Sequence, residues 1–347
     1  MARPTPLPSS RLLLSACPCR LPHVRIVDGE VFFGALRDPG VGEAERELLE
    51  LADGRTPFAD ILGQRPWLMA AAGMSRHAVW LPSALEPQAA AGPRCLVLGA
   101  HPGDAELSMG GFLLNRRGAA RFTLLNLFSR QIETRVPDAF GSRVQVTAVR
   151  RDESALAAIM TRIETLHRDL PEYVLRQTGN EDERMPMPVQ DVETAVRIAL
   201  YDAMAELAPE HVYAPAAIGN HPDQRLLFDA VLELFEEDCF PGVSYHLYEN
   251  VPLAASYLNV DDFLSRFEGS YLDPEPWFED VTGVLAEKLT LLEIFRSRLD
   301  LASRRLLLEI AQRNARLERH GLARDSDAGM DAGMERFWTL REVALYK

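Results

Sequence analysis

The sequence predicts an α/β protein with a Rossmann-like, mostly parallel sheet, helices on both of its faces, and a small N-terminal α+β domain. From residue 94 onward, short continuous apolar runs alternate with longer stretches of helical period. That alternation is typical of a parallel sheet covered on both faces. The chain has 347 residues, more than one average domain, so a principal domain with an appendage is expected.

The N-terminal part divides by composition into a loose arm at 1–22 and a small domain at 23–92. The arm is rich in Pro and Arg and shows no period. The domain is expected to contain strands at Val24–Val27 and Val31–Phe33, a helix at Gly42–Ala52 and a second helix around Ile61. This order weakly resembles the winged-helix modules of the PqqD-like type, which bind peptides or partners. A plain dimerisation or packing appendage is the alternative, and the sequence favours it.

The principal domain spans 93–347 and begins after the break at Ala89–Pro93. Its strands are expected at Cys95–Gly99, Phe122–Phe128, His211–Ala214 and Val243–Tyr248. Its helices are expected at Ala105–Arg117, Val146–His167, Val189–Leu207 and Gln224–Glu236. The stretch Val281–His320 is also predicted to be helical, with a charged and solvated face.

The composition argues against nucleic-acid and membrane partners and favours a reducing compartment. The net charge of −14 repels phosphate backbones and anionic membrane surfaces, so we expect neither nucleic acid nor membrane as a partner. No apolar run reaches the roughly 18 residues that a membrane span needs. The four cysteines are scattered and form no C-x-x-C pair, which favours a reducing cytoplasm over a disulfide framework or a structural zinc site.

Polar side chains follow two of the predicted strands, at the point where each strand ends. His101 and Asp104 follow the first strand, and His221, Asp223 and Gln224 follow another. Ligands of open α/β sheets bind at the carboxyl ends of the strands, so these two loops are expected to meet there. An imidazole and a carboxylate three residues apart can reach one divalent cation.

These segments closely resemble the signatures of the LmbE-like (PIG-L) family. The run AHPGDAELSMGG, starting at Ala100, resembles AHPDDAELGCGG, and GNHPDQ resembles the second signature, G-x-HPDH. The resemblance continues through Arg150–Glu153, similar to RREE, and through Lys288 with IFRSRL, similar to K-x-x-x-x-x-YxSQ. It ends with Glu335–Trp338 and covers about 94 to 345.

The resemblance implies a divalent metal, zinc, held by His101, Asp104 and the residue at position 224. It also implies that His221 stabilises the tetrahedral intermediate of amide hydrolysis. Position 224 is Gln, whose neutral amide is a poor zinc donor, so the metal is expected to be weakly held or absent.

The family's general base is missing as well, because its position is occupied by Gly103. A missing base typically costs roughly 10² to 10⁴ in rate. Asp223, Glu106 or a carboxylate from another loop is a candidate to take the role, and Asp223 is alternatively the N-cap of the following helix.

Three functions remain open from the sequence. The first is a metal-dependent N-deacetylase or amidase acting on an N-acyl amino sugar or a small biosynthetic intermediate, with impaired or altered chemistry. The second is an inactive descendant that binds a small molecule or recruits a protein partner through the N-terminal domain. The third is another reaction on a related substrate. Specificity is expected to reside in the loops Gln131–Gly141 and Gly179–Val189.

Overall fold

A seven-stranded, mainly parallel sheet forms the centre of the computed structural model, with the strand order β11-β12-β10-β9-β6-β7-β8. The structure describes residues 15–72, 77–81, 92–178, 188–251, 257–268, 270–299, 309–310 and 333–342. The parallel strands are β6 (Arg94–Gly99), β7 (Arg121–Asn126), β8 (Glu164–His167), β9 (His211–Pro215) and β10 (Ser244–Tyr248). The antiparallel strands are β12 (Met334–Glu342), next to β10, and β11 (Leu272–Asp280) at the edge.

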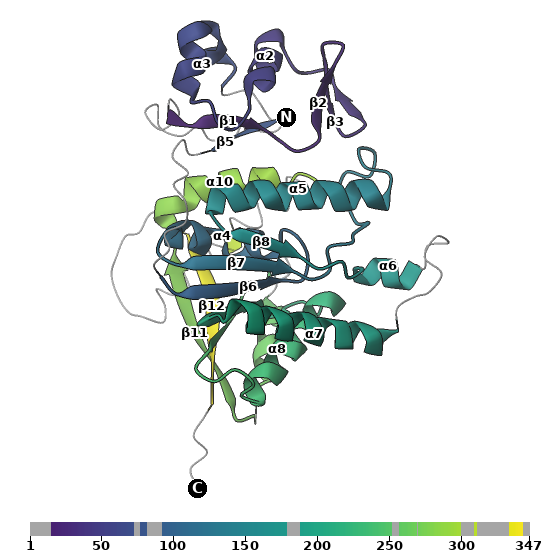
Figure 1. Ribbon diagram of the computed structural model, residues 1–347, viewed down its shortest axis with the longest axis vertical. Coiled ribbons are helices and arrows are strands. Elements are labelled where there is room, and N and C mark those ends of the chain that lie inside the picture. Colours follow the sequence, from purple (N-terminus) through teal and green to yellow (C-terminus); the bar gives the residue numbers. More distant parts are fainter. Residues whose placement is uncertain are drawn as a thin grey trace.

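Helices cover both faces of this sheet, which confirms the predicted fold class (Figure 1). One face carries α4 (Asp104–Arg116), α5 (Arg143–Thr161) and α10 (Leu285–Ile294), and the other carries α7 (Val189–Leu207) and α8 (Pro222–Glu236). The shorter helices α6 (Tyr173–Thr178) and α9 (Tyr257–Ser265) complete the set. In β6 every residue from Cys95 to Gly99 is buried, as expected for a strand covered on both faces.

The N-terminal region packs onto the layer formed by α5 and α10 (Figure 1). It has a two-stranded sheet and a three-stranded sheet, and Phe33 and Val79 share one apolar cluster with Val146 and Leu291. Its strands are β1 (Cys17–Arg20), β2 (Val24–Val27), β3 (Glu30–Phe33), β4 (Leu36–Asp38) and β5 (Ala78–Leu81). Its helices are α2 (Glu43–Leu51), α3 (Phe58–Gln64) and the 3₁₀ helix η1 (Pro66–Ala70).

Strand β1 lies inside the segment expected to be a loose arm, so ordered pairing begins earlier than the composition indicated. Cys17 to Arg20 pair with Leu81 to Ala78 in an antiparallel register. The break expected at Ala89–Pro93 falls mostly outside the described residues. The division into domains at residues 22 and 92 therefore stays a prediction.

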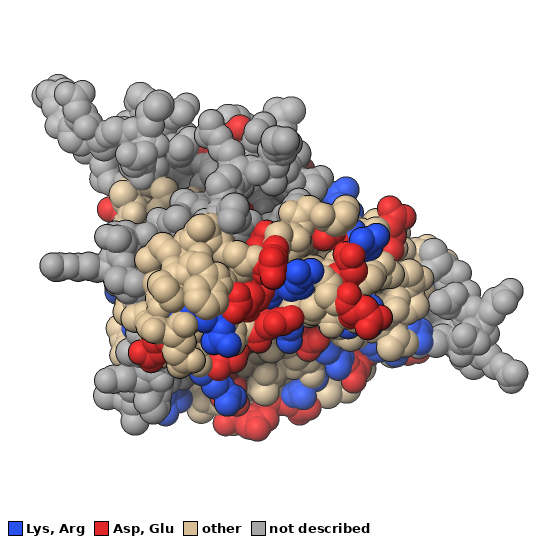
Figure 2. Space-filling view, turned by 90° about the horizontal axis from the view of Figure 1, so that it is seen from above, with Lys and Arg blue, Asp and Glu red and all other residues tan. Residues whose placement is uncertain are grey.

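The face on the N-terminal side shows acidic and basic side chains next to one another. In Figure 2 the residues drawn in colour carry Asp and Glu interspersed with Lys and Arg. Such mixing leaves no continuous basic stripe among the coloured residues of this view. In the part of the chain that the structure describes, no helix is long and apolar enough to cross a membrane.

The structure corrects several expectations of secondary structure. The helix expected to reach His167 ends at Thr161, because Arg162 adopts the left-handed region (φ 57°) and the chain then forms strand β8. Strands β11 and β12 were not predicted. The sequence of β11, LDPEPWFED, contains two prolines, which an edge strand tolerates but which weaken a strand pattern.

The helix expected over Val281–His320 is shorter in the described part. After the 3₁₀ turn η3 (Thr282–Val284), α10 runs from Leu285 to Ile294 and the chain then turns at residues 296–298. Residues 300–308 and 311–332 lie outside the described residues. The early end of α10 matters because it brings Arg298 to the sheet edge described below.

The direction in which the chain adds successive strands to the sheet reverses between β6 and β9. Strands β7 and β8 extend the sheet on one side of β6, whereas β9 and β10 extend it on the other. Strands β6 and β9 are parallel neighbours, with Cys95 opposite His211, so their carboxyl ends lie side by side. This arrangement is a topological switch point, where open α/β sheets bind ligands.

A buried ion pair joins β12 to the helices above the sheet. The carboxylate of Glu335 pairs with the ammonium of Lys288 and accepts hydrogen bonds from the backbone N–H groups of Gly111 (2.8 Å) and Phe112 (2.7 Å). Helix α4 leaves helical geometry at Met109 (φ −118°, ψ 22°), and the N–H groups just after it use this carboxylate as acceptor.

We expect Glu335→Ala to lower the free energy of unfolding by about 3–5 kcal/mol, because it leaves Lys288 as a buried, unpaired charge. Urea unfolding followed by circular dichroism measures this loss. The matched control is Glu275→Ala on β11, whose pair with Arg341 is exposed and should change stability by less than about 1 kcal/mol. Equal losses in both variants would contradict the assignment.

Candidate active site

The loop after β6 presents His101 and Asp104 at the switch point. Strand β6 ends at Gly99, and α4 begins at Asp104 with Gly103 as its N-cap. Gly103 has φ +95°, a conformation that side chains other than hydrogen rarely adopt. One oxygen of Asp104 accepts hydrogen bonds from the backbone N–H of His101 (3.0 Å) and from its Nδ1 (3.1 Å), so the loop closes on itself.

The loop after β9 presents His221, Asp223 and Gln224. His221 is the N-cap of α8, and its Nδ1 accepts a hydrogen bond from the backbone N–H of Asp223 (3.3 Å). The alternative that Asp223 is the N-cap is therefore wrong, because α8 begins two residues earlier than its sequence pattern indicated. Asp223 lies in the first turn, where the helix dipole favours a carboxylate.

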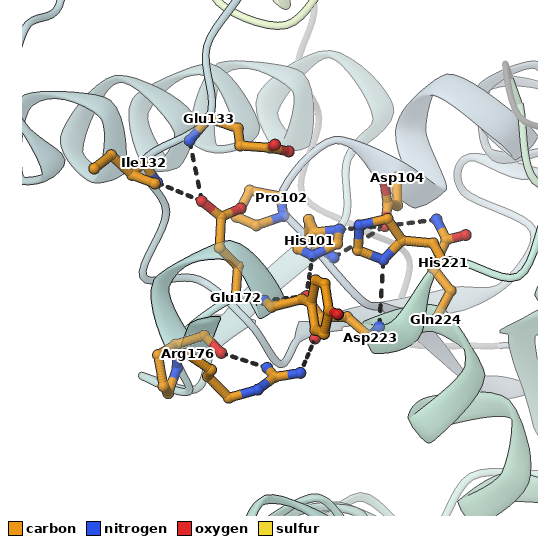
Figure 3. A network of polar contacts seen from close by, with 12 residues as sticks. His101, Pro102, Asp104, Ile132, Glu133, Glu172, Arg176, His221, Asp223 and Gln224 are labelled. Atoms are coloured by element: carbon orange, nitrogen blue, oxygen red, sulfur yellow. Dashed lines mark hydrogen bonds and ion pairs between the residues drawn. The ribbon is translucent and has the colours of Figure 1, made fainter. Parts of the chain in front are cut away.

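The two loops meet, as the sequence predicted. His101 Nε2 lies 2.8 Å from Asp223 Oδ2, and the amide nitrogen of Gln224 donates to Asp104 Oδ2 (3.2 Å). The rings of His101 and His221 stand edge to face with centroids 5.0 Å apart. Figure 3 shows these five side chains gathered around His101. Their chemical roles stay predictions.

His101 is held between two carboxylates, so both of its ring nitrogens are donors. Burial opposes its charged form, but the carboxylates of Asp104 and Asp223 outweigh this and raise the pKa of His101 to about 9. Burial likewise favours neutral Asp104, yet the charges of Arg298 and His101 hold the pKa of Asp104 far below its usual range. At neutral pH the centre of the site is therefore an imidazolium between two carboxylates.

Two guanidinium groups complete this cluster, and the sequence analysis assigned a role to neither. Arg298, from the turn after α10, pairs with Asp104 Oδ1 and donates to the carbonyl oxygen of Pro102 (3.0 Å). Arg176, from α6, lies 2.7 Å from Asp223 Oδ1. The signal for Arg298 was present, because this Arg stands where the signature YxSQ has Gln. Nothing in the local sequence pattern pointed to Arg176.

A cavity of about 610 Å³ opens beside this cluster. The loop Gln131–Gly141 forms much of its wall, and its role in specificity stays a prediction. The other loop with that predicted role, Gly179–Val189, falls mostly outside the described residues. Besides the loop, the wall contains side chains of the cluster and its surroundings: His101, Arg150, Glu172, His221, Gln224 and Arg298.

Gln224 lines the cavity, whereas Glu106 does not. Because a carboxylate only accepts, the NH₂ group of Gln224 faces Asp104, and its Oε1 has no hydrogen-bond partner among the described residues. Glu106 is fully buried, accepts a hydrogen bond from Ser154 Oγ (2.7 Å), and does not line the cavity. Burial raises the pKa of Glu106 to about 7. Its position does not suit the role of a base toward a bound substrate.

The metal that the family resemblance implies does not fit the residues as they are arranged. His101, His221 and Asp223 each offer one suitable atom, and these atoms lie within 4.8 Å of one another. However, a metal needs lone pairs, and both nitrogens of His101 face carboxylates while His221 Nδ1 accepts a backbone N–H. Asp104, which the resemblance implies as a ligand together with His101, is engaged by Arg298. The donor types are present, but they are already in use.

Comparisons with known proteins agree with the resemblance. The PIG-L family model, described as GlcNAc-PI de-N-acetylase, matches residues 96–235. A curated relative, 2′-N-acetylparomamine deacetylase of Streptomyces fradiae, is 29% identical over 256 residues, which cover 71% of this chain and 89% of the relative.

Two solved structures share the fold. A deacetylase–bog complex from the biosynthesis pathway of teicoplanin has a TM-score of 0.55 and 19% identity, covering 73% of this chain and all of that one. The zinc-inhibited form of a teicoplanin deacetylase has a TM-score of 0.52 and 18% identity with the same coverage. At these identities the likeness concerns the fold alone.

We expect Arg298→Gln to raise zinc affinity roughly tenfold or more, because it removes a positive charge from Asp104, whereas Gln224→His alone should raise it less. Isothermal titration of the purified variants with zinc measures both effects. Arg225→Gln is the control, since Arg225 follows Gln224 in the chain but pairs with Asp229 at the surface. Equal zinc binding by wild type and Arg298→Gln would show that this guanidinium does not exclude the metal.

Proposed function

Because residues 96–235 form a domain of the PIG-L (LmbE-like) family, we propose that the chain binds an N-acyl amino sugar or a related small biosynthetic intermediate in the cavity beside His101. We further propose that it hydrolyses the amide bond of that ligand only slowly. The carrying observation is the pairing of Arg298 with Asp104 beside Gly103, at the place where the family resemblance calls for a metal and a base.

The proposed ligand class is supported by the curated relative and by the cavity. The curated relative is a deacetylase of an N-acetylated paromamine. A cavity of about 610 Å³ is within the usual size for a site that encloses a small molecule. Its position at the switch point between β6 and β9 is where such folds bind ligands.

His221 and Gln224 are suited to recognise an acyl amide. Burial, followed by the charge of His101, lowers the pKa of His221, so its ring is neutral at neutral pH. Its Nδ1 accepts the N–H of Asp223, which leaves the proton on Nε2. A donor there can bind the acyl carbonyl oxygen and stabilise negative charge that develops on it. The unused Oε1 of Gln224 can accept the amide N–H or a hydroxyl.

Hydrolysis is slow in this proposal because, among the described residues, neither the position of the family's base nor Asp223 offers a carboxylate that is free to activate water. Gly103 has no side chain, and Asp223 is tied to Arg176, His101 and the backbone N–H of Tyr173 (2.8 Å). In the family, a zinc ion would polarise the carbonyl and acidify water. The missing base alone costs roughly 10² to 10⁴ in rate.

The triple change Gly103→Asp, Gln224→His and Arg298→Gln should raise acetate release from N-acetyl amino sugars by roughly 10² or more in the presence of zinc. Each single change should do much less, because base and metal act as a unit. Acetate release from N-acetylglucosamine and from 2′-N-acetylparomamine measures the rates.

Folding of the triple variant must be checked by its melting temperature. A Cβ at position 103 would lie 3.0 Å from the ring of Phe295, and the Asp residue would have to adopt φ +95°. Gly103→Asp is therefore strained in this backbone. Fast deacetylation by the wild type with zinc would contradict the proposal. A folded, zinc-loaded triple variant without activity on either sugar would place the defect in the cavity instead.

A further inference from the structure

Arg150 of helix α5 is a buried cation whose donors are mostly unused. Arg150 is 5% exposed, and its Nη2 donates a hydrogen bond to the carbonyl oxygen of Glu133 (2.9 Å). Its Nε and Nη1 have no hydrogen-bond partner among the described residues. A guanidinium does not lose its proton in proteins, so leaving these N–H groups buried without acceptors is costly.

The carboxylates around Arg150 are engaged elsewhere. Glu153, one turn further along α5, accepts hydrogen bonds from the backbone N–H (2.8 Å) and Oγ (2.5 Å) of Ser297. Glu172 accepts the backbone N–H groups of Ile132 (2.5 Å) and Glu133 (3.0 Å), as Figure 3 shows. Among the described residues, no carboxylate forms an ion pair with Arg150, although Glu153, Glu172 and Asp104 are near enough to favour its charged form.

Arg150 and Arg298 line the same cavity. Burial and then the nearby guanidinium of Arg298 lower the pKa of Arg150 to about 10, which reflects how close the two charges are. Arg135 also lines the cavity, while the carboxylates on its wall are Glu133 and Glu172. Arg298 is already paired with Asp104, so Arg150 is the buried guanidinium on this wall that has no ion-pair partner among the described residues.

We propose that Arg150 and Arg298 form an anion subsite, which binds a carboxylate or phosphate group of the ligand. The planar fork of a guanidinium matches both groups in geometry. After its bonds to Pro102 and Asp104, Arg298 retains three of its five N–H donors, and Arg150 offers Nε and Nη1. That the anion is part of an N-acyl amino sugar rests on the proposed function; the anion subsite itself does not.

Inorganic phosphate is the first probe, used at constant ionic strength with chloride as the reference anion. Phosphate should raise the melting temperature of the wild type, and Arg150→Met should lose most of that shift. The matched control is Arg151→Met on the same helix, whose guanidinium pairs with Asp169 away from the cavity and should leave the shift intact. Equal shifts in wild type and Arg150→Met would overturn the subsite.

Stability without ligand separates binding from a structural role. Replacing an unpaired buried charge by Met should leave the urea midpoint unchanged or raise it, whereas loss of a structural Arg lowers it. A lower midpoint with an unchanged phosphate response overturns the proposal. If Arg150→Met does not fold, Arg298→Gln gives the same test, because it removes the more exposed half of the subsite.

Comparing the binding of three sugars shows whether the anion is phosphate or carboxylate and whether it is part of an N-acetyl sugar. N-acetylglucosamine 6-phosphate or N-acetylmuramic acid should bind the wild type roughly tenfold or more tightly than N-acetylglucosamine, and Arg150→Met should remove the difference. Whichever charged sugar gains affinity identifies phosphate or carboxylate as the group. If neither gains affinity and phosphate alone does not bind through Arg150, the subsite is wrong. If phosphate binds through Arg150 but none of the sugars binds, the proposed function fails and the subsite stands.

Discussion

The ion pair between Arg298 and Asp104 determines what this site can do. It joins the turn after α10 to the first residue of α4, and it places a fixed positive charge on a carboxylate at the end of β6. Asp104 in turn contacts His101 and Gln224 and orients both side chains. Through Asp104, Arg298 therefore influences the position of both. Two buried carboxylates are thereby matched by two guanidinium groups and an imidazolium before any ligand enters.

Charge balance explains why the three departures from the family signatures belong together. Gly103 removes a carboxylate, Gln224 removes an imidazole, and Arg298 adds a cation beside both positions. A divalent ion needs unprotonated nitrogen and free carboxylate oxygens, whereas this arrangement supplies N–H donors. Under the proposed function, the site retains His101, Asp104 and His221 but offers a ligand N–H donors in place of a metal ion.

The proposed anion subsite lies on the wall of the same cavity. Arg150 and Arg298 lie on it, the loop Gln131–Gly141 closes much of it, and His221 presents an N–H. Donors held rigidly in a partly buried site bind an anion without moving. The free energy of desolvating their charges is part of the free energy of folding and does not oppose binding. A ligand of the proposed class would bring both an acyl group for His221 and an anion for the two guanidinium groups.

The sequence by itself determined the sheet, its switch point and the meeting of two loops. Apolar runs followed by H-x-x-D and HPDQ are local patterns, and parallel neighbouring strands must bring their carboxyl ends together. It did not reveal β11, an edge strand whose two prolines leave no clear period, nor β12, which pairs with β11. Nor did it give the roles of Arg298, Arg176 and Arg150, which lie 194, 72 and 46 positions away from Asp104 along the chain. Tertiary packing alone decided which carboxylates these cations pair with, and which of the cations lines the cavity without an ion pair among the described residues. The reason is that ion pairing depends on distance in space and not on spacing in sequence.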